Sequence, residues 1–384
     1  MQTSKLVKFN MTKISNEGYV VMKVKIIALI MVLTAFNPLL AKDKEEQKSW
    51  EYYDAEKIKI VRTHRLTTEG IYRWPRWSPD GKKISADSRG LQIFEFKENG
   101  KEIEKIGEIT DIFGNNNYAW SPDGKSIVYS AKEESSGLLL RLVKIGKEKG
   151  KLKIVSNERL TTNGGIDPTW SPDGSKIVFS WGKNLVIINS DGTNRRVLME
   201  GEKIWEPKFV GNDEILYLKG SIEAEIKPRM FRPRDTRHLF KINIRTTEEI
   251  ALFPKEIIQD FSVVLPTMYK CKIYCVTKYG EKEYVVNLDM TEKNVLPSDD
   301  EMGLSSFSPD GSKFIDVKME FEHDAAVASE IYVMNTNGTG LRQLTNTANI
   351  IENDVKWSPD GEWLLYVDQA ENSIYVSKLT RRSD

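Results

Sequence analysis

The sequence predicts an all-β fold, a β-propeller of four-stranded blades with seven blades and a ring closed by the N-terminal strand. Three observations support it: a turn tetrapeptide that recurs along the chain, a strand pattern that follows each copy, and a strand-end signature that precedes the first copy. Repeats of about 40–50 residues built from short strands are typical of propellers.

The recurring tetrapeptide is Ser-Pro-Asp-Gly, and an aromatic residue precedes every copy. Pro presets φ for the second turn position, Asp tolerates the third, and Gly supplies the positive φ at the exit. Because an alternating apolar strand follows, each copy is expected to form a β-hairpin with one buried face. The copies begin at Ser78, Ser121, Ser171, Ser308 and Ser358.

The spacing between copies predicts two further, degenerate units. The interval between the third and fourth copies is about three times the usual one, so two units should lie within it. Candidates are Glu206-Pro207-Lys208-Phe209 and Leu265-Pro266-Thr267-Met268, each placed like the segment before Ser171. Six blades would result if these two units merged into one.

Each unit also carries a predicted third strand, and several carry a fourth that ends in Leu-Thr. The sequences Asn189–Gly192 and Asn335–Gly338 read as turns between those two strands. The third strands are expected at residues 91–96, 138–145, 185–189, 238–244, 284–288, 330–335 and 373–377.

A fourth-strand ending, Leu66-Thr67, stands before the first hairpin, while the chain ends soon after the last third strand. A strand at about residues 57–66 would therefore complete the C-terminal blade. Such closure covers two sheet edges that would otherwise template aggregation.

The repeats, with the later Asn-Thr-Asn-Gly-Thr at residues 335–339 and the Leu-Thr endings, resemble those of TolB-like propellers. They are also similar to the propeller domains of prolyl-oligopeptidase-type peptidases. The resemblance covers about residues 58–384 and implies the fold more than the function. TolB itself has six blades behind an N-terminal α/β domain, and residues 42–57 are too few for such a domain, so its role in the Tol system does not transfer.

Composition excludes several classes of protein. The 56 Lys and Arg balance the 56 Asp and Glu, whereas a nucleic-acid binder usually has a basic excess. With two Cys and three His, neither a disulfide framework nor a Cys/His zinc site is expected. Cys271 and Cys275 are interpreted as independent apolar residues unless a turn brings them together.

Residues 22–41 have the order of a secretory signal peptide. Lys23 and Lys25 precede the apolar run Ile26–Phe36, and Ala41 offers a small residue at a cleavage site. The alternative is a retained membrane anchor, but the stretch falls short of about 20 apolar residues. We predict residues 1–41 as signal, with Met22 as an alternative start, residues 42–57 as a polar linker, residues 58–384 as the propeller, and a periplasmic or secreted location.

No motif in the sequence indicates catalysis. The peptidase relatives need a Gly-x-Ser-x-Gly nucleophile on a further hydrolase domain, and the chain has no such pentapeptide. His64, His238 and His323 are too scattered for a His-cluster lyase. The acidic segment Glu320–Asp324 could offer oxygen ligands to a cation, but a solvated loop explains it, and the Asp of each repeat is explained by its own turn. We predict that the chain binds no metal or cofactor and is not an enzyme.

The most unusual stretch is Ser221–Arg237, an insertion between the second and third strands of the fourth unit. Long insertions on a rigid scaffold often carry binding, and Arg with apolar residues is typical of interface anchors. Related peptidase propellers often carry an Arg-containing insertion before a similar strand, and the resemblance implies that this segment is such an insertion. The alternative is a packing loop whose Arg residues pair with Glu223, Glu225 and Asp235. The candidate partner-binding residues are Lys227, Arg229, Met230, Phe231, Arg232, Arg234 and Arg237.

Together these observations predict a non-catalytic, monomeric extracytoplasmic propeller that binds a protein or glycan of the cell envelope, with no nucleic-acid partner. The alternative is a carbohydrate-active lyase or hydrolase with a carboxylate or metal site at the centre of the ring.

Overall fold

The computed structural model describes residues 55–381, in which strands predominate and no α-helix occurs. The gaps are residues 98–99, 115–116, 135–136, 221, 228–229, 236–237, 253–260, 263–271, 278–282, 288–292, 297–301, 323–324 and 348–349. Side chains are not described for residues 222–238, 261–305, 321–325 and 381. The predicted signal sequence and most of the linker lie outside the described residues. Within them, no helix is long and apolar enough to cross a bilayer.

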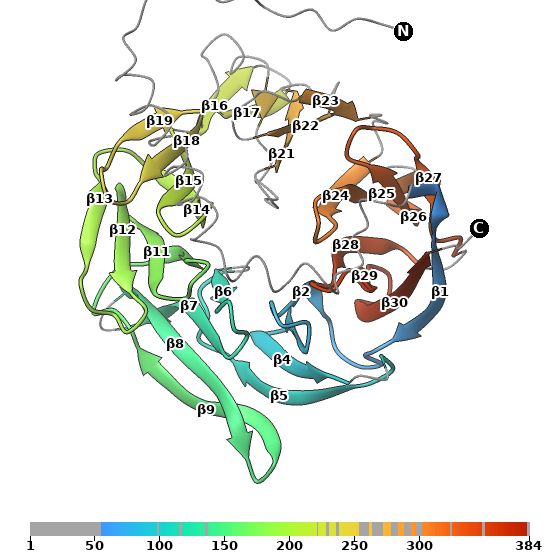
Figure 1. Cartoon of the computed structure of the whole chain (residues 1–384), viewed down its shortest axis with the longest axis horizontal. Coiled ribbons are helices and arrows are strands. Elements are labelled where there is room, and N and C mark those ends of the chain that lie inside the picture. The colour runs from blue at the N-terminus through green and yellow to red at the C-terminus, as the bar shows by residue number, and fades with distance from the viewer. Residues whose placement is uncertain are drawn as a thin grey trace, which may run out of the picture. The chain divides into compact units, whose positions relative to one another are not determined.

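The strands form seven four-stranded antiparallel sheets, the blades, placed around a common axis (Figure 1). Blade 1 contains β2 (Arg73–Trp77), β3 (Lys83–Asp87), β4 (Leu91–Phe96) and β5 (Ile103–Ile109); blade 2 contains β6 (Tyr118–Trp120), β7 (Ser126–Glu133), β8 (Gly137–Glu148) and β9 (Lys151–Arg159). Blade 3 contains β10 (Ile166–Trp170), β11 (Lys176–Trp181), β12 (Asn184–Asn189) and β13 (Arg196–Met199); blade 4 contains β14 (Ile204–Phe209), β15 (Glu214–Lys219), β18 (His238–Asn243) and β19 (Glu249–Ala251). Within the described residues the chain forms seven such sheets, so the seven-blade prediction is confirmed over the six-blade alternative.

The remaining strands complete the ring. Blade 5 contains β20 (Phe261–Ser262), β21 (Lys272–Thr277), β22 (Glu283–Asn287) and β23 (Lys293–Leu296); blade 6 contains β24 (Met302–Phe307), β25 (Lys313–Glu322), β26 (Ala325–Asn335) and β27 (Arg342–Gln343). Blade 7 contains β28 (Glu352–Trp357), β29 (Trp363–Asp368), β30 (Ser373–Arg381) and β1 (Ile58–Arg65), which follows the 3₁₀ turn η2 (Ala55–Lys57). The predicted third strands are β4, β8, β12, β18, β22, β26 and β30.

The ring closes through the N-terminal strand, as predicted. β1 pairs antiparallel with β30 from Ile58 opposite Arg381 to Arg65 opposite Tyr375. The hydroxyl groups of Thr63 and Ser377 lie 2.7 Å apart across the pair. Packing continues into blade 1, because Phe96 meets Trp77 and Trp363 edge-to-face at ring distances of 4.9 and 5.5 Å. The two ends of the propeller are thus joined by backbone pairing and by a shared aromatic core.

The apolar core lies between neighbouring blades rather than at the axis. Alternate residues of each second strand point to opposite sides of the blade, so Val178 packs toward blade 4 while Phe179 packs toward blade 2. Tyr129 of blade 2 packs in the same way against Leu91 and Ile93 of blade 1. The period-2 pattern expected after each turn is therefore satisfied on both sides of the blade, which explains the nearly continuous apolar runs.

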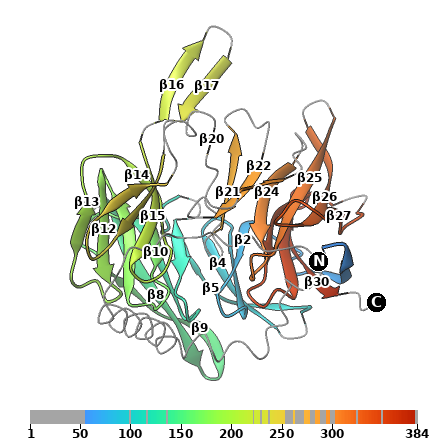
Figure 2. The ribbon, with the colours of Figure 1, turned by 45° about the horizontal axis from the view of Figure 1, so that its top comes forward.

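The strands define two faces of the propeller. We call the end that carries the Ser-Pro-Asp-Gly turns the turn face. The opposite end, which carries the connections between blades and the turns between second and third strands, is the loop face. The sheet of β16 (Ile222–Lys227) and β17 (Met230–Asp235) projects from the loop face, because it starts where β15 ends and returns to β18 (Figure 2).

Candidate functional site

The turn face is held by its own hydrogen bonds. In all five Ser-Pro-Asp-Gly turns the Ser hydroxyl donates to the Asp carboxylate at 2.5–2.7 Å. The same carboxylate accepts the N–H of the residue after Gly, and the Ser oxygen accepts the next N–H. Burial alone would raise the pKa of Asp173, but hydrogen bonds from Ser171 and Ser175 lower it. These carboxylates serve their own turns, which supports the structural interpretation over calcium binding.

The Leu-Thr endings have an equally local role on the loop face. The hydroxyl oxygen of Thr67 accepts the N–H of Ile374 at 2.9 Å, and that of Thr161 accepts the N–H of Leu140 at 2.9 Å. Thr345 accepts from Ile331 in the same way at 2.7 Å. Each Thr therefore satisfies a buried amide of the third strand where the fourth strand ends, which explains the recurrence of the pair.

At the axis, backbone bulges in the inner strands bring polar residues toward the centre. Asp167, Glu206 and Asp354 have φ values of 53°, 52° and 53°, in the left-handed region that is uncommon for residues other than glycine. The N–H of Asp167 donates to Oδ1 of Asn117 at 3.2 Å, and the N–H of Glu206 donates to Oδ2 of Asp167 at 3.3 Å. Asn117, just before the inner strand of blade 2, is thus linked in series to the bulges of blades 3 and 4.

Three basic residues, Arg76, Lys208 and Lys356, stand directly before the aromatic residues of their inner strands. With Asp167, Glu206 and Asp354 they form what we call the axial cluster. Lys356 pairs with Asp354 at 2.7 Å, and the Arg76 guanidinium lies 4.8 Å from the centre of the Tyr118 ring. Burial, followed by the nearby Arg76 charge, lowers the pKa of Lys208, although Glu206 and Asp167 oppose this. Burial raises the pKa of Asp167.

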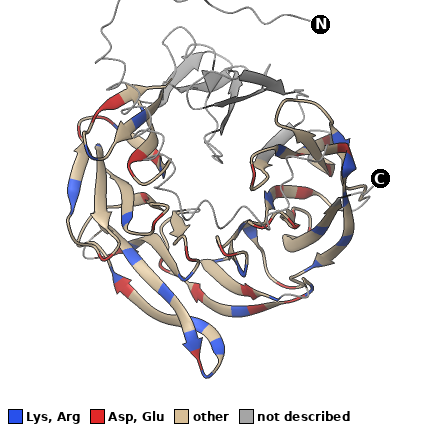
Figure 3. Ribbon diagram, in the orientation of Figure 1, with Lys and Arg blue, Asp and Glu red and all other residues tan. Residues whose placement is uncertain are grey.

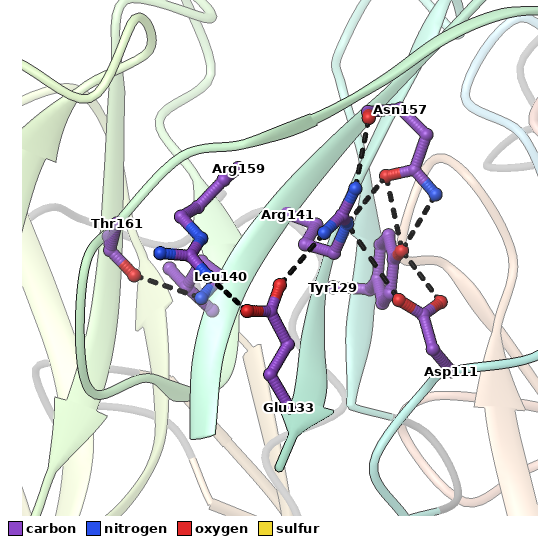
Figure 4. A network of polar contacts seen from close by, with 8 residues as sticks. All are labelled: Asp111, Tyr129, Glu133, Leu140, Arg141, Asn157, Arg159 and Thr161. Atoms are coloured by element: carbon purple, nitrogen blue, oxygen red, sulfur yellow. Dashed lines mark hydrogen bonds and ion pairs between the residues drawn. The ribbon is translucent and has the colours of Figure 1, made fainter. Parts of the chain in front are cut away.

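A polar network fixes the blade 1 to blade 2 connection on the loop face (Figure 4). The Tyr129 hydroxyl donates to Asp111 at 2.8 Å, and Asn157 donates to the Tyr129 oxygen at 2.9 Å. Arg141 donates to Asn157 and to Glu133, both at 2.9 Å, and Glu133 also pairs with Arg159. Because the network spans three strands, the loop that carries Asp111 is held against blade 2.

Exposed apolar side chains distinguish the loop face. Among the described residues, Ile71, Phe113, Trp181 and Val327 lie at or near this face with exposed fractions of 55%, 37%, 38% and 44%. Val61, Val155 and Ile250 lie on outermost strands, and Leu341 lies on the turn face. Charged residues of both signs are interspersed over the described sheets (Figure 3). Among the described residues, the loop face therefore carries exposed apolar side chains from several blades.

The predicted insertion is itself a β-ribbon, which the sequence analysis did not foresee. Its register places Glu223 opposite Arg234 and Glu225 opposite Arg232, while Ile226 is opposite Phe231. Lys227, Met230, Phe231, Arg232 and Arg234 are thus positioned along the ribbon backbone, with their side chains outside the described residues. Arg229 and Arg237 lie outside them altogether. Directly opposed unlike charges stabilise a β-ribbon, so this register agrees with both interpretations of the insertion.

The three His are not brought together in the part of the chain that the structure describes. His64 lies on β1, His238 begins β18 with an undescribed side chain, and His323 falls in a gap. Among the described residues, no group of three or more His, Cys, Asp or Glu is placed to hold a metal ion. The acidic segment Glu320–Asp324 lies mostly outside the described side chains.

Comparison of the sequence with protein-family models and with curated proteins gives no match. Among solved structures, the chain is similar to the C-terminal WD40 domain of Sif2, with a TM-score of 0.51 and 13% identity over 83% of this chain and 98% of that chain. It is also similar to a prolyl endopeptidase structure, with a TM-score of 0.53 and 10% identity over 93% of this chain. The chain is a β-propeller.

These similarities concern the fold alone, because the identities are low. The propeller spans 56% of the length of the prolyl endopeptidase chain. An oligogalacturonate lyase from Vibrio parahaemolyticus gives a TM-score of 0.36 at 14% identity, over 82% of this chain and 79% of that chain. A similarity at that level carries no argument about function.

Proposed function

We propose that this chain is a non-catalytic, TolB-like propeller that works outside the cytoplasm and binds a protein or glycan of the cell envelope through its loop face. The expected secretory signal supports the location, and the Ser-Pro-Asp-Gly and Leu-Thr repeats support the family. Both faces of a propeller can carry function, so the choice of face rests on how differently the two faces are built.

The observation that carries the proposal is the exposure of Ile71, Phe113, Trp181 and Val327 on the loop face. They come from four different connections or strand ends, so local sequence does not explain why they share a face. Exposed apolar side chains are the kind of residue that anchors a partner at a binding surface. The ribbon of β16 and β17 projects from the same face and could extend the contact area beyond the blades.

A capture experiment from envelope extract tests this proposal, with the chain from residue 42 as bait. The wild type is compared with a variant that lacks residues 223–236 and with the Arg229→Ala, Arg232→Ala, Arg234→Ala triple variant. A matched control is the Lys147→Ala, Lys149→Ala, Lys153→Ala variant of the β8–β9 hairpin, which is also basic and exposed. We expect the ribbon variants to lose the partner and the control to keep it. No retained partner in the wild type, or equal retention in all variants, would contradict the proposal.

The axial cluster favours a second function, a carbohydrate-active enzyme. Asp167, with its raised pKa, accepts a hydrogen bond from the backbone N–H of Glu206, and glycoside hydrolases use two carboxyl residues, one as acid and one as base or nucleophile. Lys208, with its lowered pKa, could act as a general base in an elimination. Perturbed titrations also occur in structural clusters, so this remains the second candidate.

The two functions are separated by activity on a panel of neutral and uronate-containing polysaccharides. An enzyme would release reducing ends or unsaturated products, and Asp167→Asn and Lys208→Met would abolish that release. A binding module would release nothing, and the same two variants would leave partner capture unchanged.

A further inference from the structure

A pocket of about 330 Å³ lies on the loop face between blades 2 and 3. Its apolar lining includes Leu138, Ile166 and Trp181, and its remaining wall includes Asn163 and glycines. This volume lies within the range of ligand sites and is large enough for one large side chain. Trp181 belongs both to this pocket and to the exposed apolar residues of the loop face.

The connection from blade 2 to blade 3 forms the wall of the pocket, and two glycines make that possible. Gly164 has φ of 71°, and a Cβ there would lie 2.1 Å from Cδ1 of the Trp181 ring. Gly165 has φ of 138°, and a Cβ there would lie 2.5 Å from Leu140. The N–H of Gly164 donates to the carbonyl of Leu138 at 2.7 Å. The pocket is therefore built by a loop held to blade 2, in close contact with the indole.

A guanidinium stands beside the pocket. Arg195 lies 4.5 Å from the centre of the Trp181 ring and 5.7 Å from that of Phe179. Its Nη1 donates to the backbone and side-chain oxygens of Asn163, at 3.1 and 3.2 Å. The Asn163 oxygens and the two rings are the partners of Arg195 within the described structure, and no described carboxylate pairs with it. Contact with the rings and Asn163 holds the guanidinium in place and leaves further N–H groups for a planar anion.

We infer that the Trp181 pocket receives a large apolar side chain of a protein segment, and that Arg195 pairs with a carboxylate next to that side chain. This rests on the proposed loop-face function and narrows it to a protein partner with an acidic and apolar segment. Charge complementarity selects this occupant. Trp181 offers an apolar anchor, and Arg195, which no described carboxylate pairs with, offers a site for an anion beside it. Trp and Arg are also the residues that most often dominate binding energy at interfaces.

The test uses short capped peptides and measures affinity by fluorescence anisotropy on the full propeller. The peptides carry a central Phe or Ala, flanked by Asp, Asn or Lys, and a trimer of N-acetylglucosamine serves as the sugar probe. We expect the Asp-flanked Phe peptide to bind best. Trp181→Ala should weaken it more than about tenfold. Arg195→Gln should remove the preference for Asp over Asn, and Arg195→Glu should shift it toward Lys.

Matched variants keep the result interpretable. Arg245→Gln changes an exposed Arg that pairs with Asp213, and Val155→Ala changes an exposed apolar residue on an outermost strand, so both should leave affinity unchanged. Gly182→Asn keeps Trp181 and Arg195 but adds a side chain on the pocket wall, where a Cβ has no neighbour within 4 Å. Asn tolerates the positive φ of that position. We expect this variant to melt like the wild type and to bind weakly.

Three outcomes would overturn the inference: equal affinity for Asp- and Lys-flanked peptides, unchanged affinity in Trp181→Ala, or binding of the sugar trimer without any peptide. Capture of an envelope partner that depends on residues 223–236 would in those cases leave the proposed function standing. Failure of that capture together with the predicted peptide preferences would instead contradict the proposed envelope partner while confirming the peptide-binding pocket.

Discussion

The turn face and the loop face use the same strands in opposite ways. On the turn face, Ser and Asp side chains are used up by the turns that they build, five times over. On the loop face, the Leu-Thr ends are the repeated feature among the described residues, and this face also carries the exposed Trp181, a pocket and a projecting ribbon. Repetition therefore marks the part of this molecule that maintains the fold, and departures from repetition mark the part that is available for binding.

The largest effect should come from removing the strand that holds both faces in one ring. A chain that begins at Thr67 lacks β1, which leaves the edge of β30 unpaired and the site of the fully buried Ile58 empty. We expect aggregation, or loss of cooperative unfolding in a thermal melt. A chain that begins at Ala55 is the control and should melt like the full protein. A soluble, cooperative fold without β1 would contradict ring closure.

A substitution inside one turn sharpens the structural side of the comparison. Ser171→Ala removes a hydroxyl that donates to Asp173 at 2.6 Å and accepts from Lys176 at 2.9 Å, at a fully buried position. We expect the free energy of unfolding to fall by about 1–3 kcal/mol, without loss of binding. Ser175→Ala in the same turn is exposed and should cost less than about 0.5 kcal/mol by denaturant titration. Equal costs would show that the buried hydroxyl is unimportant.

The Leu-Thr ending on the loop face should have a smaller effect on stability when changed, and some effect on binding. Thr161→Val leaves the N–H of Leu140 without its hydroxyl acceptor, which should cost about 1–2 kcal/mol. Because residues 163–166 line the Trp181 pocket, peptide affinity should also fall. The exposed neighbour Thr162 provides the control, since Thr162→Ala should change neither quantity. An unchanged peptide affinity in Thr161→Val would show that Thr161 does not support the Trp181 pocket.

A buried carboxylate on the loop face predicts a dependence on pH. Burial raises the pKa of Glu352 from 4.5 to about 7, and Glu330 adds to this, whereas hydroxyl groups of Thr347 and Ser329 oppose it. The folded state therefore prefers the protonated acid, so the stabilising contribution is full below the unfolded pKa of 4.5 and is lost as pH rises toward 7. The melting temperature of Glu352→Gln minus that of the wild type should therefore be larger at about pH 8 than at about pH 5. A difference in melting temperature that is the same at both pH values would contradict this prediction.

The sequence was most informative where the chain repeats. The turn serines, the third strands and the closing strand were all predicted because a local physical need recurs in similar residues. The degenerate unit at Phe209 followed from spacing and from the likeness of Glu206–Phe209 to the segment before Ser171, and β14 and β15 confirm it. The fifth-unit segment around Met268 falls outside the described residues, although β20 to β23 confirm the blade itself.

The candidate site was less predictable for a physical reason. Trp181 ends a strand of blade 3, Arg195 precedes another strand of that blade, and Asn163 lies in the connection from blade 2, so they share no motif and meet only in the folded structure. The axial bulges were missed in the same way, although an acidic residue before Pro in Asp167-Pro168 and Glu206-Pro207 was a usable signal. The Arg-rich insertion was visible in the sequence, but its register as a ribbon was not.

The most direct test of the central claim is photo-crosslinking from single positions in envelope extract. A photoreactive phenylalanine analogue would replace Ile71, Phe113 or Val327 on the loop face, and Leu341 or Val155 elsewhere, at residues of comparable exposure. The account predicts adducts to one partner from the loop-face positions and none from the other two. Adducts that form equally from Leu341 and Val155, or from those two positions alone, would contradict it.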